Sequence, residues 1–360
     1  MNTDVTAIPT RYWSRLADGR VQCEVCPRRC RLHAGQRGLC FVRGRDRDGI
    51  ELHSYGRSSG FCVDPIEKKP LKHFLPGSAV LSFGTAGCNL ACRFCQNWDL
   101  SKSRAMDTLA DSASPAELAA AARRTGCASV AFTYNDPAVF IEYAIDVAQA
   151  CRETGVRTVA VTAGYFCPDP REELFRWIDA ANVDLKAFTE RFYRKVCGAE
   201  LAPVLETLVY LVRETPVWLE VTTLLIPGEN DSDAELDAMT QWFAAELGPD
   251  VPLHFSAFHP DWKMMDRPPT PPATLTRARD IALRNGLRYV YTGNVHDRRG
   301  GSTWCPGCGA LLIERDGYEL GQWGLTQEGA CAECGILVPG VFASQPGTWG
   351  ARRQPVYMHR

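Results

Sequence analysis

Between residues 76 and 298 the chain alternates short apolar runs with longer amphipathic stretches, and this alternation limits its possible folds more than any other feature. The runs have the length and composition of buried parallel strands. They cover residues 79–85, 129–134, 158–162, 182–186, 218–225 and 253–258. Six strand–helix repeats in series require right-handed crossovers. They predict an α/β fold whose parallel sheet either stays open or curls into a barrel.

The clearest helix signal is the segment SPAELAAAARRTG. Ser114 is a preferred N-cap, Pro115 suits the first turn, Glu117 completes a capping box and Gly126 ends the helix. Comparable helical stretches cover residues 137–154, 170–181, 202–213, 232–247 and 273–285. They fall between the apolar runs, as the α/β interpretation requires.

Polar side chains and thiols recur where the predicted strands end. They are Cys88, Cys92 and Cys95 after the first run, Asn135 and Asp136 after the second, Asp184 and Lys186 at the end of the fourth, and His259 after the sixth. In a closed or partly closed barrel the carboxyl ends of all strands share one rim, where such folds build their sites. We therefore expect a single active site on that rim.

The segment TAGCNLACRFCQNWDLS places Cys88, Cys92 and Cys95 with three and then two residues between them, directly after a strand. Three thiolates at this spacing can ligate three irons of a [4Fe–4S] cluster, and no fourth cysteine follows locally. One iron would then stay open for chemistry. The alternative is a closed structural site completed by a remote cysteine. The candidates for that fourth ligand are Cys62, Cys127 and Cys167.

Glu220 and Thr222 lie on one face of the predicted fifth strand, because side chains alternate along a strand. If this face points inward, the carboxylate lines the cavity and needs a positive partner such as Lys186. If it points outward, it meets a helix. The sequence leaves both arrangements open.

Two further cysteine groups flank the central region. Cys23, Cys26, Cys30 and Cys40 lie within eighteen residues, a pattern that favours a structural metal, zinc for example, over a second iron–sulfur cluster. Cys305, Cys308, Cys331 and Cys334 form two knuckles on either side of a hairpin signal at Asp316–Gly317. They predict a zinc-ribbon or rubredoxin-like domain in which zinc is favoured over iron. These groups suggest an N-terminal metal-binding region at 1–75, a core at 76–298, a four-cysteine domain at 299–345 and a tail at 346–360.

Sixteen cysteines in a chain without a leader-like start or an 18-residue apolar run indicate a reduced, cytoplasmic protein with no membrane partner. The net charge of -2 disfavours nucleic acid as a partner. One local exception is a stretch from Arg28 to Arg47 with seven arginines and one acid, Asp46. This stretch is either a solvated face or a contact for an acidic partner.

The C-x3-C-x2-C loop, with the aromatic Phe94 before its last cysteine, resembles the radical S-adenosylmethionine (SAM) superfamily. The likeness to its branch containing pyruvate formate-lyase activating enzyme covers about residues 76–296. It implies a partial (β/α)6 barrel, a [4Fe–4S] cluster and SAM as cofactors, and a reduced flavodoxin or ferredoxin as electron donor. By the same resemblance, the residues that contact the cofactor are Phe94, Gln96, Asn135, Asp136, Asp184, Lys186 and His259, and Glu220 is a candidate contact because of its position on the fifth strand. The turn Tyr134–Asn135–Asp136–Pro137 departs from the branch's Gly-Gly-Glu-Pro pattern.

The segments VDLKAFTERFYRKVCG, EVTTLLIPGENDS, LHFSAFHPDWKM and VYTGNV, with the terminal knuckles, are similar to the radical enzyme of the AmmeMemoRadiSam system. That resemblance implies two companion proteins as partners and does not define the substrate. The expected reaction is reductive cleavage of SAM to methionine and a 5′-deoxyadenosyl radical, which abstracts a hydrogen atom. Two alternatives are an activase acting on a protein glycine and a non-enzymatic scaffold with zinc in all three cysteine groups.

Overall fold

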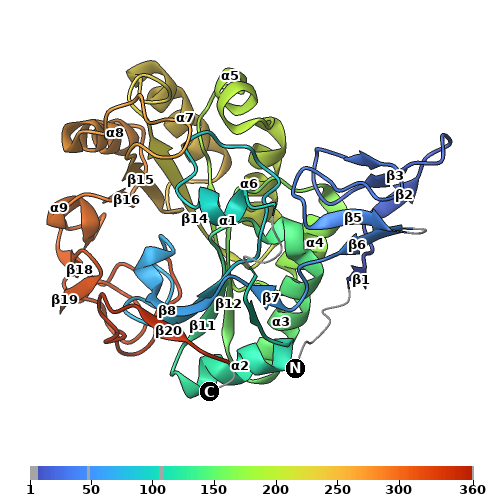
Figure 1. Ribbon diagram of the computed structural model, residues 1–360. Helices are drawn as coiled ribbons and strands as arrows, with labels where there is room; N and C mark the ends of the chain where they lie inside the picture. Colours follow the sequence, from blue (N-terminus) through green and yellow to red (C-terminus); the bar gives the residue numbers. More distant parts are fainter. Residues whose placement is uncertain (1–6, 47–48, 105–108, 359–360) are drawn as a thin grey trace.

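The computed structural model describes residues 7–46, 49–104 and 109–358, and its centre is one large sheet (Figure 1). The nine strands of this sheet run in the order β16-β15-β14-β13-β12-β11-β9-β8-β20. The seven from β16 to β9 are parallel, whereas β8 and β20 are antiparallel additions at one edge. The prediction of an α/β chain built on a parallel sheet is confirmed.

All six predicted strands are present in this sheet. They are β9 (Ala79–Phe83), β11 (Ser129–Phe132), β12 (Arg157–Thr162), β13 (Ala180–Asp184), β14 (Trp218–Leu225) and β15 (Leu253–Ala257). Nearly every residue of β9, β11 and β15 is buried, because helices or loops cover both faces of these strands. Continuous apolar runs are therefore the right signal for them.

The sheet contains strands that the sequence reading did not include. A seventh parallel strand, β16 (Val290–Gly293), pairs with β15. At the other edge, β8 (Phe61–Pro65) and β20 (Gln354–Val356) lie in segments assigned to the N-terminal region and to the tail. Within the described residues no pairing joins β16 to β20, so the hydrogen-bonded sheet is open, and barrel closure stays a prediction.

Helices connect the parallel strands, and some helices that follow one another in the chain also pack together, such as α2 with α3 and α7 with α8. The main ones are α2 (Pro115–Arg124), α3 (Ile141–Glu153), α4 (Pro168–Phe175), α6 (Ala202–Glu214), α7 (Asp233–Glu246) and α8 (Pro272–Arg284). The predicted capping box of α2 is formed: Ser114 Oγ accepts from the Glu117 N–H, and the Glu117 carboxylate accepts from the Ser114 N–H.

Shorter helical turns include η1 (Ile66–Lys68), η3 (Pro137–Phe140), α1 (Trp98–Ser101), α5 (Glu190–Phe192), α9 (Arg298–Gly301) and the π-helix η4 (Tyr193–Cys197). None of the helices in the described parts of the chain is long and apolar enough to cross a membrane.

The N-terminal region consists of small antiparallel sheets. One orders β1 (Ile8–Pro9), β6 (Gly49–Leu52) and β5 (Arg43–Asp46), and another orders β2 (Trp13–Arg15), β3 (Val21–Cys23) and β4 (Arg31–Leu32). A two-stranded ribbon joins β7 (Arg57–Ser58) to β10 (Asp111–Ser112). The buried residues of the N-terminal region, such as Val21, Val42 and Ile50, join the main core, so this region packs on the central domain.

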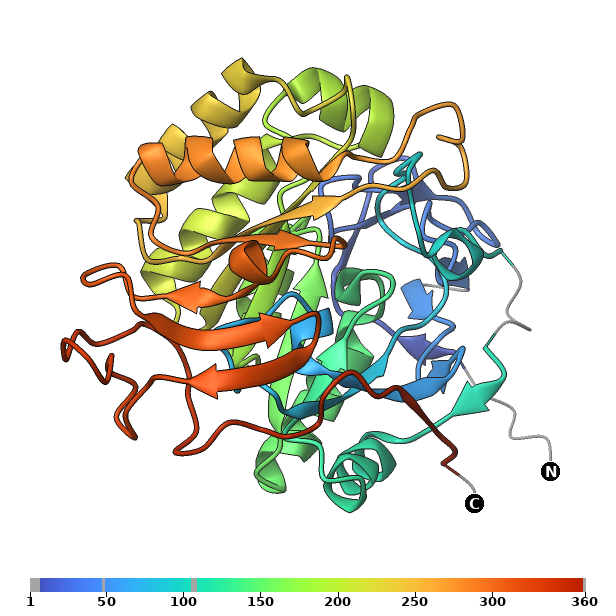
Figure 2. The ribbon, with the colours of Figure 1, turned by 90° about the vertical axis from the view of Figure 1, so that its left-hand side faces the viewer.

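The C-terminal cysteines lie in the segments that flank the strands of a three-stranded antiparallel sheet, made of β17 (Thr303–Trp304), β18 (Leu311–Asp316) and β19 (Glu319–Trp323). Asp316 pairs with Glu319, and Gly317 has a φ of 61°, which confirms the predicted hairpin turn. Leu312 and Ile313 share a small core with Tyr289 and Tyr291. Figure 2 shows this orange-to-red sheet beside the main sheet.

Candidate active site

A cavity of about 390 Å³ lies at the carboxyl ends of the parallel strands. Its walls include residues at or just after the ends of all seven parallel strands: Cys88, Asn135, Ala163, Asp184, Leu224, Ser256 and Asn294. The cavity has the size of ordinary ligand pockets. The structure thus brings the polar strand ends to one rim, as the strand order predicts.

Cys88, Cys92 and Cys95 all line this cavity on the loop between β9 and α1. Backbone bonds hold the loop against η4, since the N–H groups of Ala91 and Arg93 donate to the carbonyls of Cys197 and Val196 at 2.8 and 2.9 Å. Anchoring at fixed backbone positions is what a loop needs to keep three thiols aimed at one space.

Phe94 is buried below the loop, with its ring 5.9 Å from the ring of Phe192. Gln96 is exposed at the cavity mouth. Phe94 therefore packs the loop against α5 and also lines the cavity, whereas Gln96 faces the open side.

The three thiols fit a cluster better than a single ion. Among the described residues, Cys88, Cys92 and Cys95 do not form a group whose sulfurs all lie within 4.8 Å of one another, as a tetrahedral ion requires. A cube of iron and sulfide binds each thiolate at a different corner and so accepts a wider spacing. Thiolates are also the ligands that such clusters prefer.

Cys197 is a residue of this site that the sequence reading did not single out. A hydrogen bond from the Cys197 thiol, together with the charges of Lys186 and Lys102, outweighs the opposing effect of burial and lowers the pKa of Cys92 to about 6. The thiolate form needed for metal binding is thus favoured at Cys92. A lone cysteine at the end of η4 carries no local sequence signal of its contact with Cys92.

Neither Cys197 nor the three remote cysteines Cys62, Cys127 and Cys167 are among the residues that line the cavity. Cys127 contacts Thr125 Oγ1, and the backbone N–H of Cys167 donates to the Val25 carbonyl. Within the described residues, the cavity therefore holds three thiols and no fourth.

Asn135 and Asp136 border the cavity, but their side chains are engaged by the protein. Asn135 Nδ2 donates to the Gly87 carbonyl at 2.9 Å and its Oδ1 accepts from the Thr85 N–H at 3.2 Å. Buried Asp136 accepts from the N–H groups of Ala138 and Ala163, while burial raises the pKa of its carboxyl. Asn135 thus fixes the start of the cysteine loop, and Asp136 caps η3.

Asp184 and Lys186 form an ion pair at 2.6 Å on the cavity wall. Burial alone would lower the pKa of the Lys186 ammonium, but Asp184 and Cys92 outweigh it and raise this pKa. Lys186 is therefore charged and faces the space beside the cysteine loop.

Glu220 and His259 do not line the cavity in this structure. Glu220 points inward, as one of the two arrangements requires, but its partners are His254 and the backbone N–H groups of Lys72 and His73 instead of Lys186. His259 is exposed. Its cofactor contact therefore stays a prediction that the present geometry does not favour.

The two outer groups differ in geometry. Cys305, Cys308, Cys331 and Cys334 bring their sulfurs within 4.8 Å of one another, as a metal-ion site requires. The N-terminal four line a common pocket instead. Zinc at either group stays a prediction.

Some arginines of the stretch from Arg28 to Arg47 bind other parts of the protein and do not form a free surface. Buried Arg43 pairs with Glu142, and Arg28 donates to the carbonyls of Asn89 and Gly198. Arg47 lies outside the described residues. Arg29, Arg31 and Arg37 are exposed.

Comparison with known proteins identifies the family. The family model of the radical SAM superfamily matches residues 83–239. The uncharacterized protein MJ0808 of Methanocaldococcus jannaschii is 42% identical over 304 residues, which cover 84% of this chain and 90% of that protein.

The solved structures that match this chain have low sequence identity to it. A domain of pyruvate-formate lyase-activating enzyme from Bacteroides vulgatus is 16% identical, with a TM-score of 0.41 over 46% of this chain and 99% of that one. Streptococcus suis SuiB bound to S-adenosylmethionine is 14% identical, with a TM-score of 0.48 over 64% of this chain and 53% of that one. A radical SAM methyltransferase from Sphaerobacter thermophilus is 16% identical, with a TM-score of 0.47 over 85% of this chain and 81% of that one.

The superfamily match runs from the last residue of β9 into the first half of α7, and it contains the three cavity cysteines and the Asp184–Lys186 pair. A [4Fe–4S] cluster and SAM are the cofactors that this family implies, and the donor set of the cavity fits them. The chain belongs to the radical SAM superfamily.

Proposed function

We propose that this chain is a radical enzyme in which Cys88, Cys92 and Cys95 hold a [4Fe–4S] cluster with one iron open to SAM. When bound, the cluster supplies the electron that splits SAM into methionine and a 5′-deoxyadenosyl radical, which abstracts a hydrogen atom from a substrate. One observation carries the proposal: three thiols and the Asp184–Lys186 pair line the same cavity at the strand ends.

The side chains of the cavity have distinct tasks in this proposal. The Lys186 ammonium neutralises the carboxylate of the bound methionine moiety, and Asp184 accepts from a ribose hydroxyl while holding Lys186 in place. Asn135 keeps the cysteine loop in register through the Gly87 carbonyl. The protein thus supplies ligation, orientation and shelter from water.

The proposal requires a one-electron donor, because cleavage of the sulfonium bond consumes an electron that the chain's own side chains do not provide. We assign this role to a reduced flavodoxin or ferredoxin in the cytoplasm. The two companion proteins of the AmmeMemoRadiSam system are proposed partners on the strength of the sequence resemblance alone.

The decisive experiment compares Cys92→Ala with Cys127→Ala in anaerobically reconstituted protein reduced by dithionite. Cys127 is a buried thiol outside the cavity and serves as the matched control. The Cys92 variant should form no 5′-deoxyadenosine from SAM, whereas the Cys127 variant should form it at the wild-type rate. Product formed by Cys92→Ala at the wild-type rate would exclude the proposed ligand set.

A further inference from the structure

The three cysteine groups of this chain differ in how closely their sulfurs approach. In the C-terminal group the Sγ atoms of Cys305 and Cys334 lie 3.5 Å apart, and those of Cys308 and Cys331 lie 3.7 Å apart. Four thiolates around one tetrahedral ion, at a metal–sulfur distance near 2.3 Å, have sulfurs about 3.8 Å apart. This group therefore has the spacing of a single-ion site.

The N-terminal group lacks this spacing. Cys23, Cys26, Cys30 and Cys40 all line one pocket, yet no three of their sulfurs lie within 4.8 Å of one another. The family-defining group of Cys88, Cys92 and Cys95 shares this wider separation. Within the part of the chain that the structure describes, the N-terminal thiols thus resemble the cluster ligands and not the ion site.

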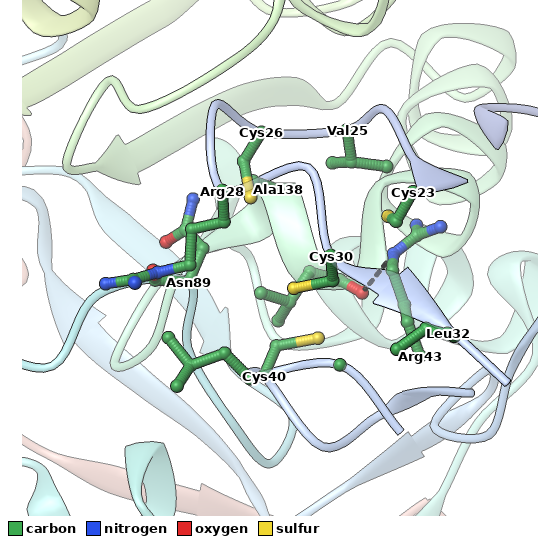
Figure 3. A pocket seen from close by; sticks show the side chains of 13 residues that line it. Cys23, Val25, Cys26, Arg28, Cys30, Leu32, Cys40, Arg43, Asn89 and Ala138 are labelled. Atoms are coloured by element: carbon green, nitrogen blue, oxygen red, sulfur yellow. Dashed lines mark hydrogen bonds between the residues drawn. The ribbon is translucent and has the colours of Figure 1, made fainter. Parts of the chain in front are cut away.

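The pocket presents four thiols, which is the number of ligands that a [4Fe–4S] cluster takes. Figure 3 shows the sulfurs of Cys26, Cys30 and Cys40 turned toward a common space, with Cys23 on the side next to Arg43. The remaining wall is largely apolar, and Arg28 and Arg43 also line it. Two guanidinium groups can balance the negative charge of a buried tetrathiolate cluster, and a dry wall protects it from solvent.

The pocket also adjoins the catalytic cysteine loop. Asn89, the residue after Cys88, lines the N-terminal pocket and accepts through its backbone carbonyl from Arg28 Nε. A Cβ added to Gly87 would lie 1.8 Å from the Cys40 carbonyl oxygen, so the two loops are in direct backbone contact. Electrons passing between groups held by these loops would cross only one layer of protein.

We propose that Cys23, Cys26, Cys30 and Cys40 ligate a second [4Fe–4S] cluster, which relays single electrons to the catalytic cluster. The relay role rests on the proposed function, whereas the presence of the cluster does not. One electron leaves the reduced flavodoxin or ferredoxin and reduces the second cluster from the 2+ to the 1+ state. The same electron then passes to the catalytic cluster, so that the second cluster returns to 2+ and the donor is oxidised by one electron.

The first experiment detects the second cluster without changing its ligands. In a variant with Cys88, Cys92 and Cys95 all replaced by Ala, anaerobic reconstitution should leave a brown protein that contains iron and inorganic sulfide in equal amounts. Its reduced EPR signal should not respond to SAM, because all four irons have cysteine ligands. Wild-type protein should hold twice this iron and sulfide, apart from any single iron at the C-terminal group.

Loss of all inorganic sulfide from this triple variant, with zinc recovered at the N-terminal group, would overturn the second cluster. Inorganic sulfide separates the outcomes, because a single iron bound by the C-terminal cysteines brings none. The readout does not depend on SAM cleavage, so failure here is distinct from failure of the proposed function.

The second experiment addresses the relay with Cys26→Ala. This variant should retain the iron, sulfide and SAM-responsive EPR signal of the catalytic cluster. With dithionite, which reaches that cluster directly, it should form 5′-deoxyadenosine at a rate within about twofold of wild type. With reduced flavodoxin the rate should fall at least tenfold. An equal loss with both reductants would show a purely structural role and refute the relay.

Discussion

His254 Nε2 and Glu220 Oε2 lie 2.7 Å apart in the buried centre of the sheet, on neighbouring strands β15 and β14. The Glu220 carboxylate also accepts from the backbone N–H groups of Lys72 and His73, which belong to the segment between β8 and β9. A single carboxylate therefore ties two strands to the segment between β8 and β9. It supports the core and is not part of the cavity wall.

Replacement of Glu220 by Gln should destabilise the folded protein. The substituted side chain has only one oxygen, and its NH2 group would face N–H donors that the Glu220 carboxylate now accepts from. One of these buried donors would therefore lose its acceptor. Breaking a buried charged network of this kind costs about 3 kcal/mol. Thermal unfolding should show a lowered midpoint, whereas the exposed control Glu206→Gln should unfold like wild type.

The same pair predicts how stability depends on pH. Burial opposes the charged form of Glu220, but the hydrogen bond and charge of His254, the charge of His73 and the Lys72 N–H together outweigh it, and the pKa of Glu220 is lowered from 4.5 to about 2. The stability that this shift contributes is fully present above pH 4.5 and is lost as the pH falls toward 2. Burial lowers the pKa of His254 below 6.5, so its contribution also declines below pH 6.5. The unfolding midpoint should fall on acidification, and less steeply in Glu220→Gln.

Asn135→Ala should weaken retention of the catalytic cluster. The alanine cannot donate to the Gly87 carbonyl or accept from the Thr85 N–H, so the loop before Cys88 loses its side-chain anchor. Each lost bond costs about 1 kcal/mol. Iron content after gel filtration should drop, while Asn285→Ala, a substitution on an outer helix end, should retain full iron. Unchanged iron in Asn135→Ala would contradict the anchoring role.

Lys186→Ala should weaken SAM binding if the ammonium neutralises the cofactor carboxylate. A charged hydrogen bond contributes about 1.5–3 kcal/mol, which corresponds to an increase in Kd of about 10- to 100-fold. Anaerobic titration monitored by the EPR signal of the reduced cluster measures this Kd directly. Exposed Lys195 provides the control substitution Lys195→Ala, for which the Kd should not change. Equal Kd values for both variants would remove Lys186 from the binding site.

Removal of metal from the C-terminal cysteines should unfold the small sheet without affecting the catalytic cluster. The apolar core there includes only a few side chains, such as Leu312, Ile313 and Val338, so the metal contributes much of its stability. Cys308→Ser should increase hydrogen exchange of β18 and β19, measured by mass spectrometry. Iron and sulfide at the other groups should stay at wild-type levels. Unchanged exchange would show that the sheet does not need the ion.

The sequence by itself determined the features that depend on neighbouring residues. Strand-length apolar runs located β9, β11 and β12 because burial on both faces demands continuous hydrophobicity. The capping box of α2 and the hairpin turn at Gly317 also follow from residues a few positions apart. The spacing of Cys88, Cys92 and Cys95 indicated the family chemistry for the same reason.

Only the tertiary structure decided the features that join distant segments. The partners of Glu220, the contact of Cys197 with Cys92, and the pairing of β20 with β8 all link residues far apart in the chain. The separation of sulfurs within the cysteine groups likewise depends on how each loop packs. The two C-terminal pairs lie far apart in the chain yet form a tight group, whereas the four N-terminal cysteines lie within eighteen residues and form a wide one. Sequence spacing sets which thiols can meet. The packing of the surrounding backbone sets how far apart they stand, and therefore which metal centre they suit.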